Sequence, residues 1–224
     1  MIILTGSSGG LGSKLIKSLS LIDDVILTYN RNKIELEGAR SLKLDITNEH
    51  EVISFVNTQK IYLKKITLIN MATFSKDGLL ANYKTDDWKK TFDVNLNGPF
   101  YLIKNLLPLM IAQNWGRIIN ISSFLSNNGA IGASAYSSSK SALIGLTKSL
   151  SKEYGRFNIN SNIIELGYFN GGLADTLSNQ IRNDILKKIP SKKLGRIEEI
   201  SSLIGLIIDS SYINGSTLKI NGGI

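Results

Sequence analysis

Short apolar segments of strand length alternate with helical segments along most of this 224-residue sequence. The chain begins with MIILT, continues through the glycine-rich GSSGGLG, and then enters SKLIKSLSLI, where the spacing of leucine and isoleucine predicts a helix. Further strands are predicted at residues 24–29, 41–46, 65–70, 116–123, 158–166 and 216–220, and further helices at 51–59, 85–114, 134–154 and 197–209. Such alternation is typical of a parallel sheet covered by helices on both faces.

Crossovers between parallel strands are right-handed, so we expect an α/β fold with a Rossmann-type, doubly wound parallel β-sheet. The length suits a single domain spanning residues 1–224 better than two independent ones. Residues 168–195 interrupt the alternation with glycines, a proline and an amphipathic helix but no strand. An insertion beyond the carboxyl end of a strand is where a substrate lid would lie, and we predict one here.

The composition excludes several kinds of chemistry. There is no cysteine, so disulfides, thiolate catalysis and cysteine-ligated metals are ruled out. The single histidine, His50, lies among acidic and polar residues at a predicted helix start and is expected to be solvated. Because the chain has no other histidine, neither a Ser-His-Asp mechanism nor a multi-histidine zinc site has another candidate. We therefore expect no metal site. The remaining chemistry has to use other side chains.

The charge pattern bears on partners and location. The net charge is +8, but the lysines are spread along the chain without a basic helix or interleaved aromatic residues. This favours acidic or phosphorylated small partners over nucleic acid. The sequence opens without a secretory signal pattern and holds no apolar run of about 18 residues. We therefore expect a cytoplasmic protein with no membrane partner.

The glycine-rich stretch after the first predicted strand carries Gly6, Gly10 and Gly12, with Ser8 and Leu11 between them. Glycine lets a phosphate approach the backbone, and the helix that follows offers unpaired N–H groups and a positive dipole end. A plain tight turn is the alternative interpretation. The position between a strand and a helix favours a dinucleotide-binding loop, so all five residues are candidates for cofactor binding.

The second predicted strand ends in ILTYNRNK, which places Asn30 and Arg31 where an adenosine ribose would lie. No acidic residue follows until Glu35, and Arg31 can meet a 2′-phosphate, so the pattern favours NADP(H) over NAD(H). Asp45 ends the next strand in LKLD and can accept a hydrogen bond from the adenine amino group. A helix-capping role for Asp45 or Thr47 is the alternative.

Tyr136 and Lys140 lie four residues apart in SAYSSSK and would share one face of a helix. A neighbouring ammonium stabilises a phenolate, so this pair can perform general acid–base chemistry at neutral pH. An ordinary polar pair on a helix surface is the alternative interpretation of the same spacing. We interpret the serines between the two residues as small spacers.

The combined motifs TGSSGGLG, LDIT, DVNLNGPF, INISS and YSSSK resemble those of the short-chain dehydrogenases/reductases over the whole chain. The tail, with KKLGRIEEI and YINGSTLKINGGI, is similar to the subgroup that contains the 3-oxoacyl carrier-protein reductases. The resemblance implies hydride transfer between a nicotinamide cofactor and a carbonyl or alcohol. It also implies a homo-oligomer, a tetramer or dimer. The apolar helix face of Ala142, Leu143, Leu146 and Leu150 could serve that interface or pack in the core.

The resemblance assigns catalytic roles to Asn95, Ser123, Tyr136 and Lys140. Ser123 would hydrogen-bond the substrate carbonyl and Tyr136 would protonate it. Lys140 would hold the nicotinamide ribose and lower the pKa of Tyr136, while Asn95 would support a water that resupplies the proton. The remaining candidates for cofactor binding, beside Tyr136 and Lys140, are Ile46, Asn70, Ala72, Gly167 and Phe169.

Some positions depart from the family pattern or add to it. The family usually has Asn-Asn-Ala-Gly where this chain has NMAT, so Thr73 stands in place of the glycine. Leu166 stands in place of a proline, and the threonine expected near Gly171 is missing. Pro99, four residues after Asn95, has no N–H, so we predict that the Asn95 carbonyl is free to hold the relay water.

The sequence therefore predicts an NADP(H)-dependent oxidoreductase, with 3-oxoacyl thioesters, linked to a carrier protein or CoA, as the first substrate candidates. A dehydrogenase or reductase of a sugar or other small alcohol is the second interpretation. A dinucleotide-binding redox regulator without turnover is the third, and the intact Tyr136 and Lys140 argue against it.

Overall fold

The computed structural model describes residues 1–35, 39–171 and 178–224. Within these residues seven strands form one sheet in the order β3-β2-β1-β4-β5-β6-β7, and every neighbouring pair is parallel. The strands are β1 (Ile2–Leu4), β2 (Val25–Tyr29), β3 (Arg40–Lys43), β4 (Thr67–Asn70), β5 (Gly116–Ser123), β6 (Ile159–Leu166) and β7 (Thr217–Ile220). The predicted doubly wound fold is confirmed.

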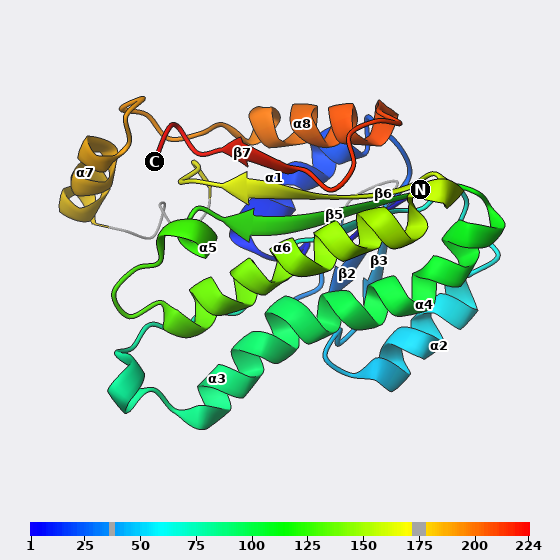
Figure 1. Cartoon of the computed structure of the whole chain (residues 1–224), viewed down its shortest axis with the longest axis horizontal. Coiled ribbons are helices and arrows are strands. Elements are labelled where there is room, and N and C mark those ends of the chain that lie inside the picture. Colours follow the sequence, from blue (N-terminus) through cyan, green and yellow to red (C-terminus); the bar gives the residue numbers. More distant parts are fainter. Residues whose placement is uncertain (36–38, 172–177) are drawn as a thin grey trace.

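The strand order reverses between β1 and β4, because the chain builds outward from β1 toward β3 and then returns to add β4 through β7. In Figure 1 the strands β5, β6 and β7 point to the left, so their carboxyl ends lie on that side of the molecule. In open α/β sheets ligands bind beyond the carboxyl ends of the strands at such a reversal. The topology thus fixes where a site can be built.

Helices cover both faces of the sheet (Figure 1). On one face α1 (Gly10–Leu19) packs with α8 (Ile197–Asp209), and both contribute buried leucine and isoleucine side chains to a common core cluster. On the other face α2 (Glu49–Gln59), α4 (Gly98–Ala112) and α6 (Ser134–Tyr154) enclose a second cluster. Among the described residues no helix combines the length and apolar character needed to cross a membrane.

The helical stretch predicted at residues 85–114 consists of three parts. It begins with α3 (Thr85–Phe92), continues as a π-helical segment (Asp93–Asn97), and ends with α4. In the π segment the Gly98 N–H donates to the carbonyl of Asp93, five residues back rather than four. Single π turns inside α-helices occur frequently at functional sites. Here the turn contains Asn95, whose side chain is fully buried.

The apolar face of α6 serves mainly the core. Leu143 and Leu150 are buried, and Leu146 is partly buried against the cluster beneath α6. Core packing therefore accounts for most of this face.

The predicted lid region contains α7 (Asn179–Lys188) and no strand among its described residues, while residues 172–177 lie outside the described part of the chain. Phe169 and Gly195 form an isolated parallel bridge that holds the two ends of this insertion together. Figure 1 places α7 on the side toward which the strands point. The described part of the insertion thus lies at the same end as the expected site.

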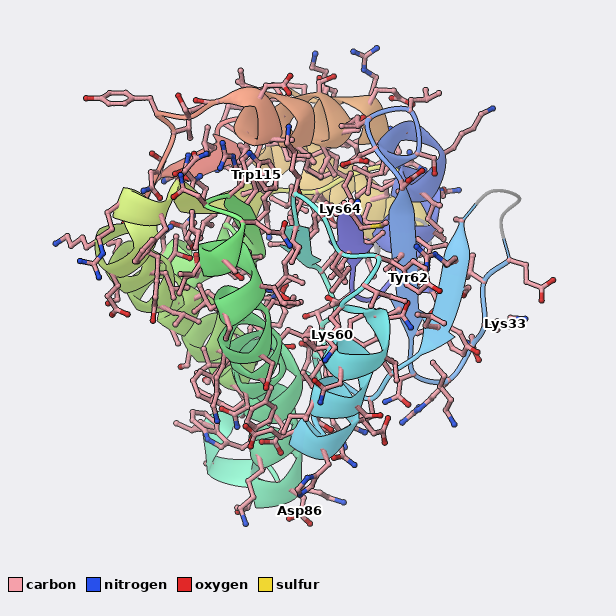
Figure 2. The ribbon with its side chains drawn as sticks, turned by 90° about the vertical axis from the view of Figure 1, so that its right-hand side faces the viewer. Lys33, Lys60, Tyr62, Lys64, Asp86 and Trp115 are labelled. Carbon is pink, nitrogen blue, oxygen red and sulfur yellow. The ribbon has the colours of Figure 1, made fainter. Side chains whose placement is uncertain are left out.

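The opposite edge of the sheet carries exposed basic and aromatic side chains. Figure 2 shows Lys60, Tyr62 and Lys64 in the connection between α2 and β4, and Trp115 just before β5. The Arg40 guanidinium lies 4.5 Å from the centroid of the Tyr62 ring. These residues lie at the amino ends of the strands, away from the edge at which a doubly wound sheet binds ligands.

Candidate active site

The glycine-rich loop is folded tightly enough to require glycine at two positions. Gly6 has φ +67°, and a Cβ atom there would lie 2.6 Å from the Cα atom of Ala72. A Cβ atom on Gly12 would lie 2.3 Å from the carbonyl oxygen of Gly6. These close approaches bring α1, the loop and the residues after β4 together at the strand reversal.

The N-terminus of α1 has the features of an anion site. The N-cap residue is Gly9, no side chain caps the helix, and its first turn holds no acidic residue. The helix begins at Gly10; Ser8 precedes it, Leu11 lies in its first turn, and both are half-buried. Uncapped backbone N–H groups and the positive end of the helix dipole suit a pyrophosphate. The residues present therefore fit a dinucleotide cofactor.

Thr5 fixes the segment that follows β4. Its hydroxyl oxygen accepts hydrogen bonds from the backbone N–H groups of Met71 and Ala72, each at 3.0 Å. Asn70 is buried and donates through Nδ2 to Oδ1 of Asn120, at 2.8 Å. The Asn70 Oδ1 atom is buried without a hydrogen-bond partner among the described residues. The side chain of Asn70 thus joins β4 to β5.

Asn95 is the centre of a buried hydrogen-bond network. Its Nδ2 donates to the carbonyl of Phe74 at 2.9 Å and to Oγ of Ser139 at 3.0 Å. Its Oδ1 accepts from the Phe74 N–H at 2.7 Å and from the Thr73 hydroxyl at 3.2 Å. The Ser139 hydroxyl in turn donates to the Tyr136 carbonyl, at 2.8 Å. Asn95 therefore ties the segment after β4 to the first turn of α6.

Tyr136 lies in the first turn of α6, and the hydroxyl-bearing residues that influence its pKa are Ser123 and Thr73. Burial raises the pKa of Tyr136, and the two hydroxyls oppose that effect without cancelling it. The sequence-based expectation was a lowered pKa of Tyr136. The difference arises because desolvation outweighs the local hydrogen bonds.

Lys140 is buried one helical turn after Tyr136. Its Nζ donates to the carbonyl of Ile121 on β5 at 2.9 Å, and lies 5.8 Å from the centroid of the Tyr136 ring. Burial lowers the pKa of Lys140 to about 8, so it remains mostly protonated at neutral pH. A buried ammonium is costly, so the positive charge that Lys140 keeps at pH 7 indicates a position built for chemistry rather than for stability.

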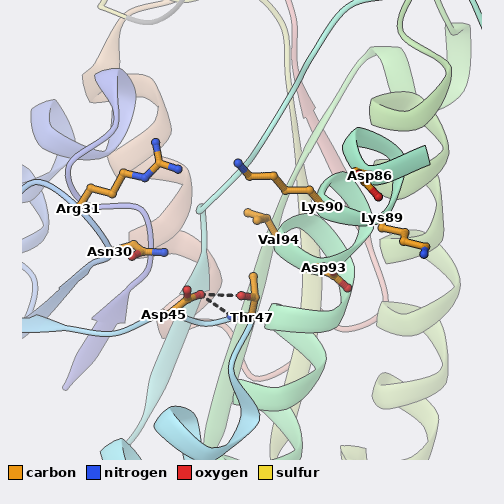
Figure 3. A pocket seen from close by; sticks show the side chains of 9 residues that line it. All are labelled: Asn30, Arg31, Asp45, Thr47, Asp86, Lys89, Lys90, Asp93 and Val94. Carbon is orange, nitrogen blue, oxygen red and sulfur yellow. Dashed lines mark hydrogen bonds between the residues drawn. The ribbon is translucent and has the colours of Figure 1, made fainter. Parts of the chain in front are cut away.

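A cavity of about 280 Å³ lies beyond the carboxyl ends of β2 and β3. Figure 3 shows its lining, which comprises Asn30, Arg31, Asp45, Thr47, Asp86, Lys89, Lys90, Asp93 and Val94. Lys90 extends into the opening toward the side that carries Arg31, whereas Lys89 points away from it (Figure 3). The structure thus brings the three polar residues predicted for the adenosine end into one pocket and adds residues from α3 and the π segment.

Asp45 is held in place by its neighbours. Its Oδ1 accepts from the Thr47 N–H at 2.9 Å and from the Thr47 hydroxyl at 2.7 Å. Burial alone would raise the pKa of Asp45, but hydrogen bonds from Thr47 and Asn30 together keep it below its usual value. The alternative role in helix capping is wrong, because Asn48 caps α2 through His50 and Glu51. His50 itself is exposed, as expected.

The other predicted cofactor residues pack their side chains elsewhere. Ile46 is buried against Gly98, where a Cβ atom would lie 2.7 Å from its Cδ1 atom. Phe169 is buried against Gly195, and Gly167 packs against Asn221. Only the main chain of these residues can face a cofactor. At Gly171, with φ +95°, the space that a Cβ atom would fill is covered by the Lys14 side chain.

Sequence reasoning missed two contributors to the site. Ser139 was interpreted as a spacer, yet its hydroxyl connects Asn95 to the backbone of Tyr136. Thr73 was noted only as a departure, yet its hydroxyl donates to Oδ1 of Asn95. The position of Ser139, three residues after Tyr136 on the same helix face, was the available signal. For Thr73 the sequence offers none, because its partners are distant in the chain.

Comparisons with known proteins agree with this geometry. The family model described as short chain dehydrogenase matches residues 1–182. A 3-oxoacyl-[acyl-carrier-protein] reductase of Buchnera aphidicola is 34% identical over 234 aligned residues, covering 99% of this chain and 96% of the relative. The Nodulation protein G of a Rhizobium species is 29% identical, with 99% and 95% covered.

A crystal structure of a candidate gluconate dehydrogenase from Agrobacterium tumefaciens superposes with a TM-score of 0.91. It covers 100% of this chain and 94% of that one at 22% identity, which supports the fold. The match of the family model over most of the sequence, together with the full-length relatives, leads to one conclusion. The chain belongs to the short-chain dehydrogenase family of oxidoreductases, whose members act on alcohols and carbonyls.

Proposed function

We propose that this enzyme reduces a carbonyl with NADPH, and that 3-oxoacyl thioesters are its first substrate candidates. The observation that carries the proposal is the convergence of Ser123, Tyr136 and Lys140 at the carboxyl edge of the sheet, beside the phosphate-binding loop. The relatives named as 3-oxoacyl-[acyl-carrier-protein] reductases support the choice of substrate. The net charge of +8 suits an acidic carrier protein or a CoA thioester.

A nicotinamide cofactor, when bound, would supply the hydride that adds to the carbonyl carbon. The Ser123 hydroxyl donates a hydrogen bond to the carbonyl oxygen and holds it beside Tyr136. The Tyr136 O–H transfers its proton to that oxygen as the negative charge develops, which yields the alcohol and leaves a phenolate. In the reverse direction the phenolate removes the alcohol proton.

Lys140 and Asn95 maintain the geometry around Tyr136. The Lys140 ammonium, anchored on the Ile121 carbonyl, lies close enough to favour the phenolate and to hold the nicotinamide ribose. Asn95 fixes α6 against the segment after β4 through Ser139 and Phe74. We keep as a prediction that the Asn95 carbonyl, opposite Pro99, holds a water that resupplies the Tyr136 proton.

The pocket at the adenosine end supports a preference for NADP(H). Arg31 and Lys90 extend into it from opposite sides (Figure 3). A guanidinium and an ammonium can together neutralise a 2′-phosphate. Both hydrogen bonds from Thr47 go to Oδ1 of Asp45, so Oδ2 is the atom that would accept from the adenine amino group.

The proposal includes the surroundings of the site. Residues 168–195 would cover the substrate, because their described part lies beyond the carboxyl end of β6. A cytoplasmic homo-oligomer would use the outer face of α4, where Phe100 is 45% exposed. Size-exclusion chromatography with light scattering would test the oligomer directly.

The test is NADPH oxidation, followed by absorbance, with a panel of 3-oxoacyl thioesters, simple ketones and keto-sugars. We expect turnover with 3-oxoacyl thioesters, and a loss of about a thousandfold or more in Tyr136→Phe. Tyr154→Phe, at the other end of α6, is the matched control and should keep full activity.

Each alternative gives a distinct result. Turnover with keto-sugars alone would redirect the proposal to small alcohols. NADPH binding without reduction of any carbonyl would favour a dinucleotide-binding regulator. Equal activity of Tyr136→Phe and wild type would remove Tyr136 from the mechanism.

A further inference from the structure

Glu165 is a buried carboxyl group that the proposed reaction does not use. It lies near the carboxyl end of β6, and only 1% of its surface is exposed. Strands buried inside a parallel sheet normally carry apolar side chains, and a buried carboxylate is costly unless hydrogen bonds compensate it. The reason for an acidic residue here must therefore lie in the groups that it contacts.

Each oxygen of Glu165 accepts a hydrogen bond from an asparagine side chain. Oε2 accepts from Nδ2 of Asn127, and Oε1 accepts from Nδ2 of Asn221 at 3.2 Å. The Nζ atom of Lys219, whose side chain is more than half exposed, lies 3.7 Å from Oε1. The carboxyl group thus joins two segments that are far apart in the sequence.

The first of these segments follows Ser123 directly. Asn127 belongs to the short helix α5 (Leu125–Asn128), which begins two residues after Ser123. The Leu125 N–H donates to Oγ of Ser123 at 3.2 Å, and the Phe124 N–H donates to a carbonyl at the end of β6 at 3.0 Å. Holding Asn127 on β6 therefore fixes the turn that orients the Ser123 hydroxyl.

The second segment, residues 221–224, follows β7. The Asn221 side chain donates to the Ile224 carbonyl and accepts from the Gly223 N–H, each at 3.1 Å, so it folds this segment into a turn. The Ser191 N–H donates to the carbonyl of residue 222 at 3.1 Å. The Ile224 side chain packs on a small apolar cluster formed by Ile185, Ile189 and Leu194. The turn thus connects Glu165 to the insertion at residues 168–195.

The parts joined by Glu165 meet where the proposed substrate would bind. Figure 1 shows α5, α7 and the C-terminus on the side toward which the strands point. Phe124, beside α5, and Tyr168, at the start of the insertion, also touch directly, with ring centroids 5.2 Å apart. A group that fixes both parts can therefore influence how substrate is enclosed and how it is aligned.

We propose that Glu165 is a positioning residue that couples the turn after Ser123 to the insertion at residues 168–195. As a role in catalysis, this rests on the proposed function, in which Ser123 holds the carbonyl oxygen and the insertion covers the substrate. The hydrogen bond to Asn127 maintains the alignment of Ser123, and hence kcat. The hydrogen bond to Asn221 maintains the position of the insertion, and hence KM.

Hydrogen exchange of the whole chain, without cofactor or substrate, tests the coupling itself. Glu165→Met keeps the length of the side chain and removes both acceptor oxygens. The amides to follow are Leu125, in the turn after Ser123, and Ser191, in the insertion. We expect exchange to become about tenfold faster at both amides in Glu165→Met. Unchanged exchange at both would overturn the proposal.

Two further variants each remove one arm of the coupling. Asn127→Ala should accelerate exchange at Leu125 alone, and Asn221→Ala should accelerate it at Ser191 alone. Asn127 is exposed and Asn221 half-buried, so both variants should fold even if Glu165→Met does not. Unchanged exchange in both asparagine variants would equally refute the coupling.

The matched control is Asn128→Ala. Asn128 is the exposed neighbour of Asn127 in α5, and its side chain makes no hydrogen bond within the part of the chain that the structure describes. Exchange in this variant should match wild type at both amides. Acceleration equal to that of Asn127→Ala would show that any change in α5 loosens the turn, and would contradict a specific role of Glu165.

Steady-state kinetics with the substrate found in the carbonyl panel connects the coupling to the reaction. Asn127→Ala should lower kcat about tenfold with little change in KM, whereas Asn221→Ala should raise KM about tenfold with little change in kcat. Adding Asn127→Ala to Glu165→Met should lower kcat no further, because the same hydrogen bond is already absent. A fully additive loss would overturn the proposal. Faster exchange without turnover of any carbonyl would leave the Glu165 coupling standing and refute the oxidoreductase proposal.

Discussion

The two ends of the candidate site are built in opposite ways. Around Asn95 and Lys140 the side chains are buried, come from several elements, and are fixed by hydrogen bonds of 2.7–3.2 Å. At the adenosine end Asn30, Arg31 and Lys90 are exposed and line an open pocket. Proton transfer requires fixed geometry, whereas selection between two cofactors requires charge at the surface.

This difference has an energetic side. A buried ammonium is desolvated, so Lys140 lowers the free energy of unfolding, whereas the exposed Arg31 changes it very little. Changes at the reacting end should therefore alter both stability and activity. Changes at the adenosine end should alter only the choice of cofactor.

The largest combined effect on activity and stability is expected for Lys140→Met. We expect activity to fall about a hundredfold or more, because both the nicotinamide ribose and the Tyr136 phenolate lose a cation. At neutral pH the variant should be more stable than wild type by about 1–3 kcal/mol, since a desolvated charge is removed. Urea unfolding measures the stability, and Lys148→Met, an exposed lysine on the same helix, is the control.

The stability gained in Lys140→Met should depend on pH, because the pKa of Lys140 is lowered in the folded chain. Between pH 8 and 10.5 the unfolded chain holds a proton on Lys140 that the folded chain has lost, so wild-type stability rises with pH in this window. The cost of Lys140 is fully present below about pH 8. The advantage of Lys140→Met should shrink as the pH rises through the window, and an advantage independent of pH would contradict the account.

A smaller effect is expected for Asn95→Ala, which removes the four hydrogen bonds of a buried side chain. We expect a loss of about 2–4 kcal/mol in the free energy of unfolding and a fall in kcat. Asn97→Ala removes a half-buried bond to Asp93 in the same π segment and should cost less than about 1 kcal/mol. Equal losses in both variants would show that the Asn95 network has no special role.

The smallest effects are expected at the adenosine end. Arg31→Ala should weaken NADPH binding about tenfold and leave NADH binding nearly unchanged, since only NADPH carries the 2′-phosphate. Lys90→Ala should weaken NADPH binding about threefold. Lys84→Ala is the matched control, because that exposed lysine lies just before α3 and does not line the pocket. Fluorescence titration with both cofactors distinguishes these outcomes, and equal losses for both cofactors would refute a phosphate contact.

Features that depend on neighbouring residues could be predicted from the sequence, whereas features that depend on tertiary structure could not. The sheet, the helices and the glycine-rich loop could be predicted because periodicity and turn residues are local signals. The π turn at Asp93–Asn97 was not predicted, since the sequence indicated one helical stretch over residues 85–114. The capping role of Asn48, rather than Asp45 or Thr47, depends on where α2 begins.

The site was predicted in part for the same reason. Tyr136 and Lys140 are neighbours on one helix, so their spacing is visible in the sequence. The hydrogen bond of Thr73 to Asn95 joins residues 22 positions apart, and the approach of Lys90 to the Arg31 pocket likewise depends on tertiary structure. The raised pKa of Tyr136 also escaped prediction, because it follows from burial.

The central claim is that Tyr136 supplies the proton while the nicotinamide supplies the hydride to a carbonyl carbon. The most direct measurement is a single turnover with NADPH deuterated at the transferable position and a 3-oxoacyl thioester, analysed by mass spectrometry. We predict one deuterium on the carbinol carbon of the product, at a rate reduced about a thousandfold or more in Tyr136→Phe. Tight NADPH binding with no deuterium in the product, or an undiminished rate in Tyr136→Phe, would contradict the claim.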